Sequence, residues 1–159
     1  MPRSWRVTLL ATVVTTLFAG CGVSIPTDPE GTLERVSGGT LRVGVSPNPP
    51  WTVTSGNAQP TGSEVDLVTE FAASLPAQVQ WTVGGEEPLI KALERGELDL
   101  VIGGLTSDTP WTEHAGVTKP YGEATDPAGE RVELVMAAPP GENAFLLRLE
   151  KFLLTRGSA

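Results

Sequence analysis

The sequence is poor in the side chains on which covalent catalysis, metal binding and cross-linking depend. Cys21 is its only cysteine, so no disulfide can form within the chain and the fold must rest on a hydrophobic core. His114 is its only histidine, which argues against a histidine-based metal site or a catalytic histidine base. The glycine pairs 84–85 and 103–104 fit turns and match no phosphate-binding loop of known form. We therefore expect a protein that is not an enzyme and needs neither a metal nor a cofactor.

Basic residues are also scarce. The chain carries 11 Lys and Arg residues against 19 Asp and Glu residues, a formal net charge of −8 at pH 7. This balance makes nucleic acid and anionic lipid poor partners, because both would be repelled, and it favours cationic ligands. Solubility alone is an equally good explanation of the acidity, so the charge by itself does not identify a ligand.

The N-terminal apolar run is too short to cross a bilayer. Residues 7–18 carry no charge and number about a dozen, inside the range of a secretory signal peptide, whereas a membrane span needs about 20 residues. Arg3 and Arg6 precede the run and supply the positive charge typical of such signals. We expect residues 1–20 to be a signal peptide that is removed on export.

The end of this run, LFAGC at residues 17–21, resembles the lipobox of bacterial lipoproteins. In those proteins a lipid is added to the cysteine thiol, and cleavage leaves that cysteine as the first residue. Phe18 stands where leucine is usual, with Leu17 one place further out. The resemblance implies lipidation at Cys21 and a chain held on a membrane, facing the periplasm or the cell exterior. The alternative is an ordinary secretory peptide with an incidental thiol.

The remaining chain predicts a linker followed by one α/β domain. Residues 21–38 are rich in glycine and proline and are expected to be a linker, and residues 39–157 are expected to form the domain. Apolar alternation with a period of two residues predicts strands at 40–46, 78–83, 98–102 and 133–138. Helical periodicity predicts helices at 63–75, 88–95 and 145–153.

Turn and cap residues complete this outline. Ser63 and Asp66 fit a capping box, and Thr109 followed by Pro110 fits the start of a short helix. Residues 122–131, rich in Gly, Pro and Asp, predict a loop. Strands that alternate with helices in this way predict a three-layer α/β/α fold with a mainly parallel sheet.

A series of segments in the same order and spacing resembles the amino-acid-type extracellular solute-binding proteins of bacterial ABC importers. The family has an LRVGV-like strand, a Pro-Pro-aromatic turn, a helix start of the form G-x-D/E-V-D-L, an L..G..D..I.G.T segment and an S-K-P-Y-like ending. The counterparts here are residues 41–45, 49–51, 62–67, 93–106 and 118–121. The resemblance implies one lobe of a periplasmic binding protein, which binds a small solute and delivers it to a membrane transporter.

The chain departs from the family in two respects. After residue 121 the family crosses into a second lobe, and ligand is clamped between the two lobes, whereas only the short segment 122–131 stands here. We expect a single-lobe form, and the sequence leaves open whether this is a genuine loss or a gene-model error. The family also fixes the amino-acid carboxylate with an arginine five places after a threonine, here Thr106, where this chain has Trp111. Amino-acid specificity is therefore not carried over.

The resemblance places a ligand rim where the strands of the lobe end. It implies that an aromatic side chain stacks on the ligand and that backbone and hydroxyl groups hydrogen-bond it. The implied rim residues are Trp51, Gly104, Leu105, Thr106 and Trp111, with Asp108 and Tyr121 as secondary candidates. Aromatic rings beside a carboxylate are the ingredients of a cation-binding cage, so the hypothesis is a cationic or amine-bearing solute.

Structural explanations compete with this hypothesis at several positions. Trp81 fits the core, Trp111 fits a buried staple of the short helix, and Glu64 and Asp66 fit the acids that favour a helix start. The function also has an alternative: an accessory protein that uses the same rim to dock on a membrane transporter or sensor rather than to bind a solute.

Overall fold

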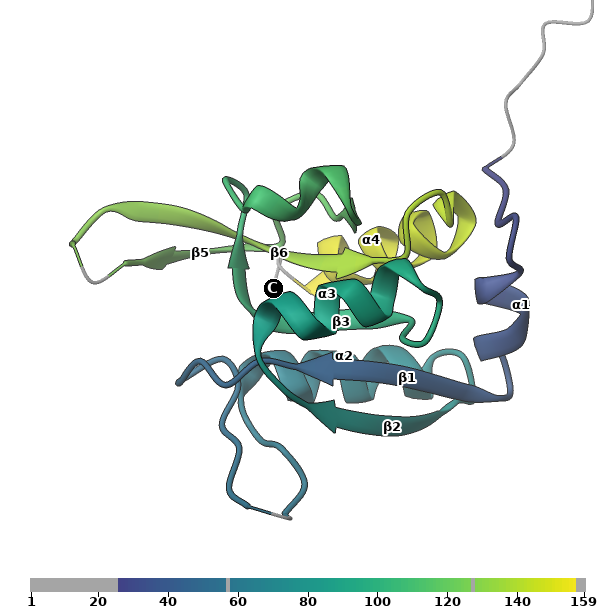
Figure 1. Cartoon of the computed structure of the whole chain (residues 1–159), viewed down its shortest axis with the longest axis horizontal. Coiled ribbons are helices and arrows are strands. Elements are labelled where there is room, and N and C mark those ends of the chain that lie inside the picture. Colours follow the sequence, from purple (N-terminus) through teal and green to yellow (C-terminus); the bar gives the residue numbers. More distant parts are fainter. Residues whose placement is uncertain (1–25, 57, 127, 157–159) are drawn as a thin grey trace, which may run out of the picture.

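The computed structural model describes residues 26–56, 58–126 and 128–156. Within these ranges a single mixed sheet lies between helices on both of its faces (Figure 1). The predicted signal peptide, residues 1–20, and the predicted lipidation site, Cys21, lie outside the described residues.

The sheet has a parallel half and an antiparallel half. Its strand order is β2-β1-β3-β6-β4, with β5 also paired to β6. β1 runs parallel to β2 and β3, whereas β6 runs antiparallel to β3, β4 and β5. The strands are β1 Thr40–Val45, β2 Gln78–Val83, β3 Leu100–Thr106, β4 Gly116–Val117, β5 Gly122–Thr125 and β6 Arg131–Ala138. The predicted α/β class is confirmed, and the predicted strands are all present.

Side-chain alternation along the strands divides the core into two layers. Leu41, Val43 and Val45 of β1 pack against α2 and α4 on one face. Val101 and Leu105 of β3 pack against α3 on the other face, so the fold has the predicted three layers. In Figure 1, α3 lies in front of the sheet and α2 behind it. The helices are α1 Thr32–Val36, α2 Ser63–Ala73, α3 Glu86–Glu94, the 3-10 helix η1 Pro110–Glu113 and α4 Asn143–Arg156.

The second half of the predicted linker is part of the fold. Residues 32–36 form α1, in which Thr32 and Val36 are buried. The Glu142 carboxylate accepts hydrogen bonds from the Thr32 and Glu30 amides, each at 2.9 Å. The Asp28 carboxylate accepts hydrogen bonds from the Phe145 amide at 3.0 Å and from its neighbour at 2.7 Å, at the start of α4. Folded residues therefore precede the expected boundary at residue 39, because an acid before α1 and an acid before α4 each cap the helix that follows the other.

Three smaller predictions also differ from the structure. Ser63 is the first residue of α2 and makes no side-chain cap, since Gly62 occupies the cap position. The glycine pair 103–104 lies inside β3 rather than in a turn after it. The segment 122–131 pairs as β5 with β6, and this hairpin projects from the body of the domain at the left of Figure 1.

We predict that replacing Asp28 by alanine lowers the free energy of unfolding by about 2 kcal/mol, because the substitution removes a cap from both α1 and α4. Chemical denaturation of the purified protein measures the change. Glu30→Ala is the matched control, since the side chain of Glu30 is exposed and only its backbone amide bonds to Glu142. Equal stability of the two variants would mean that the segment before α1 is a linker after all.

Candidate functional site

The carboxyl ends of β1 and β3 meet at one edge of the sheet, which is where open α/β sheets place ligands. The turn after β1 is tied to β3 by Asn48, whose side-chain amide donates a hydrogen bond to the Gly103 carbonyl at 2.8 Å. Trp51 lies against Gly104, where an added Cβ would come within 2.7 Å of the indole. Gly104 has φ +65°, so any other residue there would meet both strain and the indole. Trp51 and Gly104 are therefore neighbours, as the rim prediction requires.

A buried carboxylate supports this edge from below. Glu64 of α2 is 0% exposed, and one of its oxygens accepts hydrogen bonds from the Gly103 and Gly104 amides, each at 2.9 Å. Its other oxygen accepts a hydrogen bond from the Tyr121 hydroxyl. One side chain thus joins the start of α2, the irregular stretch of β3 and the segment before β5. Sequence reasoning treated Glu64 as one of two helix-start acids and missed this role.

The surroundings of Glu64 change the titration of both partners. Burial raises the pKa of the Glu64 carboxyl, and the hydrogen bonds from Tyr121 and from the glycine amides oppose part of that rise. Burial and the neighbouring Glu64 carboxylate raise the pKa of the Tyr121 hydroxyl, which therefore stays a hydrogen-bond donor. Tyr121 was a secondary ligand candidate, and the structure commits its hydroxyl to Glu64 instead.

A polar hollow of about 250 Å³ lies beside the end of β3. Within it the Thr106 hydroxyl donates a hydrogen bond to the Asp108 carboxylate. Leu105 reaches the hollow, but its side chain is buried in the core below α3. The lining residues are Glu86, Gly104, Leu105, Thr106, Asp108, Thr109 and Pro110. The structure therefore brings together Gly104, Leu105, Thr106 and Asp108 of the predicted site.

Trp111 does not line this hollow. It is half-buried against the core below α3, and its indole N–H donates a hydrogen bond to the Glu86 carboxylate. The aromatic candidates therefore do not gather around the polar hollow, because Trp111 bonds to Glu86 while Trp51 and Tyr121 line a separate hollow. Glu86, at the start of α3, was not among the predicted site residues, and only the pair of acids at that helix start could have indicated it.

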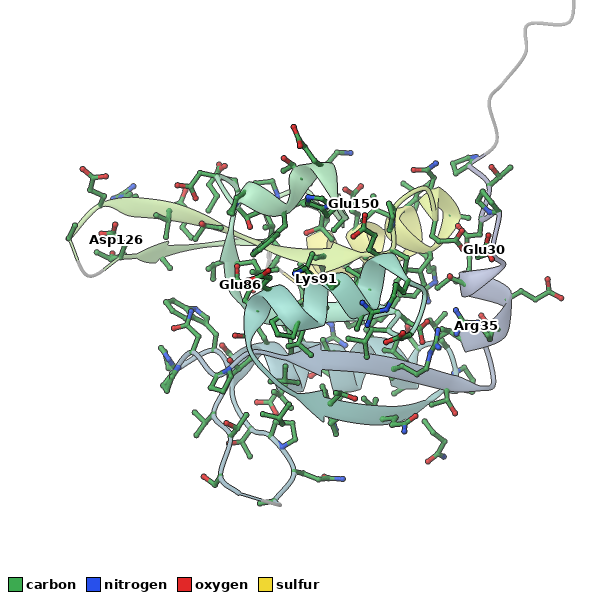
Figure 2. All side chains as sticks on the ribbon, in the orientation of Figure 1. Glu30, Arg35, Glu86, Lys91, Asp126 and Glu150 are labelled. Atoms are coloured by element: carbon green, nitrogen blue, oxygen red, sulfur yellow. The ribbon has the colours of Figure 1, made fainter. Side chains whose placement is uncertain are left out.

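The hollow carries uncompensated negative charge. No Lys, Arg or His is among its lining residues, which include the carboxylates of Glu86 and Asp108. Neither carboxylate forms an ion pair with the described residues. Figure 2 shows Glu86 at the end of the domain from which the β5–β6 hairpin projects. The arrangement suits a ligand that brings positive charge.

Two other hollows differ in chemistry. A hollow of about 240 Å³ that Trp51 shares with Leu67, Tyr121 and Leu153 is mostly apolar. Another, of about 530 Å³, lies beside α1 at the other end of the domain, where Figure 2 labels Arg35. Three guanidinium groups line it. Those of Arg35 and Arg42 pair with the buried Asp99 at 2.8 and 2.6 Å, so they hold the fold together, and that of Arg95 pairs with Glu97 at 2.7 Å.

The described residues contain no helix long and apolar enough to cross a membrane. They also contain no group of three or more His, Cys, Asp or Glu side chains placed to hold a metal ion.

We predict that Glu64→Gln removes a pH-dependent part of the stability. Because the folded state raises the pKa of Glu64, this part is fully present below pH 4.5, the ordinary pKa of the group, and is lost as pH rises through the raised pKa. The measurement is the free energy of unfolding of wild type minus that of Glu64→Gln, from about pH 5 to about pH 8. This difference should fall with rising pH.

The same difference, Glu64 protein minus Glu64→Gln protein, is also measured in a Tyr121→Phe background. Tyr121→Phe removes a hydrogen bond that favours the ionised Glu64 carboxyl, so the fall in the difference should move to higher pH. A difference that stays flat over the whole pH range in both backgrounds would contradict the raised pKa of Glu64.

Comparison with known proteins agrees with this architecture. A model of the bacterial extracellular solute-binding proteins, family 3, matches residues 41–132. The probable histidine-binding protein of Campylobacter jejuni subsp. jejuni is 28% identical over 82 residues, which make up 52% of this chain and 32% of that relative. The chain thus spans well under half the length of the curated relative that it matches.

Solved structures match the domain over nearly all of their own length. Domain 1 of the T. maritima arginine-binding protein, in its arginine-bound form, has a TM-score of 0.65 and 26% identity, covering 76% of this chain and 95% of that domain. A single-substitution mutant of the same domain has a TM-score of 0.69 and 23% identity, covering 80% and 99%. An ancestral cationic amino acid solute-binding protein has a TM-score of 0.67 and 16% identity, covering 80% and 94%. The fold is therefore that of one lobe of a periplasmic binding protein.

The family match covers more than half of the chain, from β1 to the first residues of β6, and includes the polar hollow. The chain belongs to the bacterial extracellular solute-binding proteins, family 3.

Proposed function

We propose that the protein is a lipid-anchored, extracytoplasmic substrate-binding protein whose ligand is a small cationic or amine-bearing solute. The observation that carries the proposal is the lining of the polar hollow, which holds Glu86 and Asp108 and no cationic side chain. A positively charged ligand gains Coulomb energy there, and an anionic ligand loses it. The excess of acidic over basic residues in the whole chain favours the same sign of ligand.

The relatives support this ligand class without fixing the ligand. The similar proteins include one named as histidine-binding and several described as arginine-binding. Binding without covalent chemistry fits these relatives, although one structural neighbour is described as a precursor of cyclohexadienyl dehydratase. Delivery of the bound solute to an ABC importer in the membrane follows from the same family.

A single lobe can contribute only one wall to a ligand, whereas well-formed pockets bury most of a ligand's surface. The domain of the T. maritima arginine-binding protein that was solved alone is described as arginine-bound, so one lobe of that protein holds a cationic ligand. In this chain the wall consists of the polar hollow, with Trp51 packed against Gly104 beside it. A second copy or another chain would complete the enclosure.

The ligand class is tested by a thermal-shift panel on the purified protein, covering polyamines, guanidines, quaternary amines, amino acids, sugars and dicarboxylates. We predict a shift with cations alone. A ligand at about 100 times its dissociation constant adds about 2.7 kcal/mol, which raises the melting temperature by several degrees. A shift with dicarboxylates or sugars and none with cations would contradict the proposal.

The docking alternative has one observation in its favour, the apolar hollow of about 240 Å³ that includes Trp51. Aromatic and aliphatic side chains around such a hollow suit the anchor residues of a protein interface. If no compound of any class shifts the melting temperature, and crosslinking through Trp51→Cys in membranes captures a transporter subunit, the rim is a docking surface and the solute proposal fails.

The membrane anchor is tested separately at Cys21. We predict that wild-type protein sediments with the membrane fraction and that Cys21→Ser protein is released, because the substitution removes the thiol that takes the lipid. Two acyl chains hold a protein firmly, whereas one gives marginal binding, so the release should be nearly complete. Cys21→Ser protein that still sediments with membranes would show that the attachment does not depend on this residue.

A further inference from the structure

One residue that lines the polar hollow carries a buried hydroxyl that nothing in the described part of the chain satisfies. Thr109 lines the hollow and is 8% exposed, and its Oγ1 is buried with no hydrogen-bond partner among the described residues. Thr109 occupies the cap position before η1, where a threonine hydroxyl ordinarily accepts a backbone amide, but no such bond is made. A buried polar group without a partner destabilises the folded protein, and a ligand that supplies the partner removes that cost.

The two carboxylates of the hollow, those of Glu86 and Asp108, also have unused hydrogen-bond acceptor positions. Glu86 accepts a hydrogen bond from the indole of Trp111, and Asp108 accepts one from the hydroxyl of Thr106. Both donors are neutral, so neither carboxylate is compensated in charge. A carboxylate offers about four acceptor positions on its two oxygens, so most of that capacity remains for a ligand.

The lack of aromatic residues in the lining of the polar hollow determines which kind of cation fits there. A quaternary ammonium has no N–H and is recognised by aromatic faces. The polar hollow has no aromatic residue in its lining. Trp111 is hydrogen-bonded to Glu86 without lining the hollow, and Trp51 lines the separate apolar hollow. The lining offers hydrogen-bond acceptors instead, which suit the N–H groups of a primary ammonium or a guanidinium. A ligand carboxylate would find no cationic side chain in this lining.

We infer that the ligand is a small N–H-bearing cation, a primary amine or a guanidinium compound without a carboxylate, held by Glu86, Asp108 and Thr109. The inference rests on the proposed function and narrows it from cations in general to this class. It makes these three residues the ones that determine specificity, with Trp111 and Thr106 orienting the two carboxylates through their hydrogen bonds.

Isothermal titration calorimetry of the full-length protein tests the inference with four probes. Agmatine and putrescine carry N–H groups and no carboxylate, arginine adds a carboxylate, and choline carries a charge without N–H. We expect agmatine or putrescine to bind at least about tenfold more tightly than choline, because each lost charge-assisted hydrogen bond costs about 1.5–3 kcal/mol, or about tenfold or more in affinity. We expect a similar advantage over arginine, because its carboxylate would meet two carboxylates and no cationic side chain in the lining.

Substitutions locate the site. Glu86→Gln and Asp108→Asn keep an acceptor for Trp111 and Thr106 and remove the charge, so each should weaken binding of the better probe about tenfold or more. Glu87→Gln is the matched control, since Glu87 is the next residue of α3 and pairs with Lys91 at 2.6 Å, outside the hollow. That variant should bind as wild type does.

Substitution of Thr109 can distinguish a ligand-binding role from a purely structural one, because stability and binding should change in opposite directions. Thr109→Val keeps the shape and removes the unsatisfied hydroxyl, so it should raise the melting temperature of the unliganded protein while weakening ligand binding several-fold. Thr109→Ser keeps a hydroxyl and should retain the binding. A Thr109→Val protein that is stabilised and binds the probe as tightly as wild type would overturn the role of this hydroxyl.

The remaining outcomes separate this inference from the function on which it rests. Choline or arginine binding as tightly as agmatine and putrescine would overturn the inference and leave the cationic-solute proposal standing. Unchanged binding in Glu86→Gln and Asp108→Asn would also overturn it, since cations would then bind elsewhere. If no cation of any kind binds, the proposed function itself fails.

Discussion

The candidate site depends on one buried carboxylate. Glu64 holds the amides of Gly103 and Gly104 and the hydroxyl of Tyr121, and these groups belong to β3 and to the segment before β5. Without this acceptor the two amides would be buried donors with no partner, which costs about 1–3 kcal/mol for each group. The carboxylate fixes the irregular course of β3, and that course places Gly104 against Trp51 and sends Thr106 and Asp108 into the hollow. The edge that holds the candidate site is therefore shaped by a residue that does not line the polar hollow.

Local patterns were enough to predict the layers of the fold. The strand at 78–83 has the predicted limits, and the apolar periodicity of the three longer helices places their buried faces correctly. Long-range polar contacts were not predictable, because nothing near Asp28 indicates that it will cap a helix more than a hundred residues later, as its bond to Phe145 does. The hairpin at 122–131 was missed for a related reason. β5 contains Gly, Glu, Ala and Thr, so it lacks the apolar alternation from which its pairing with β6 could be predicted.

The ligand site stays a prediction, and the surroundings of its residues differ from the expected ones. A polar hollow lies beside the end of β3, at the edge of the sheet where the ends of parallel strands meet. The aromatic residues were given the wrong partners, since sequence spacing places Trp111 near the rim but does not show that its indole turns to Glu86 on another element. Glu86 begins a helix, where acidic residues are common for electrostatic reasons alone, so its type and position gave no separate sign of a ligand. A site built from side chains on different elements becomes visible only when the elements are placed in space.

Acidic residues serve opposite purposes at the two ends of this domain. Near α1, Asp99 is buried between two guanidinium groups, so its charge is compensated within the fold. Buried Glu142 accepts hydrogen bonds from two backbone amides, which hold the start of α1. At the ligand edge Glu86 and Asp108 receive only neutral donors, and Thr109 beside them receives none. Thr109 is buried without a partner, which costs stability, whereas Asp108 is exposed and Glu86 half-buried, so both carboxylates stay open to a ligand. The partners of the acids, more than their number, distinguish the end of the domain with the candidate site from the end near α1.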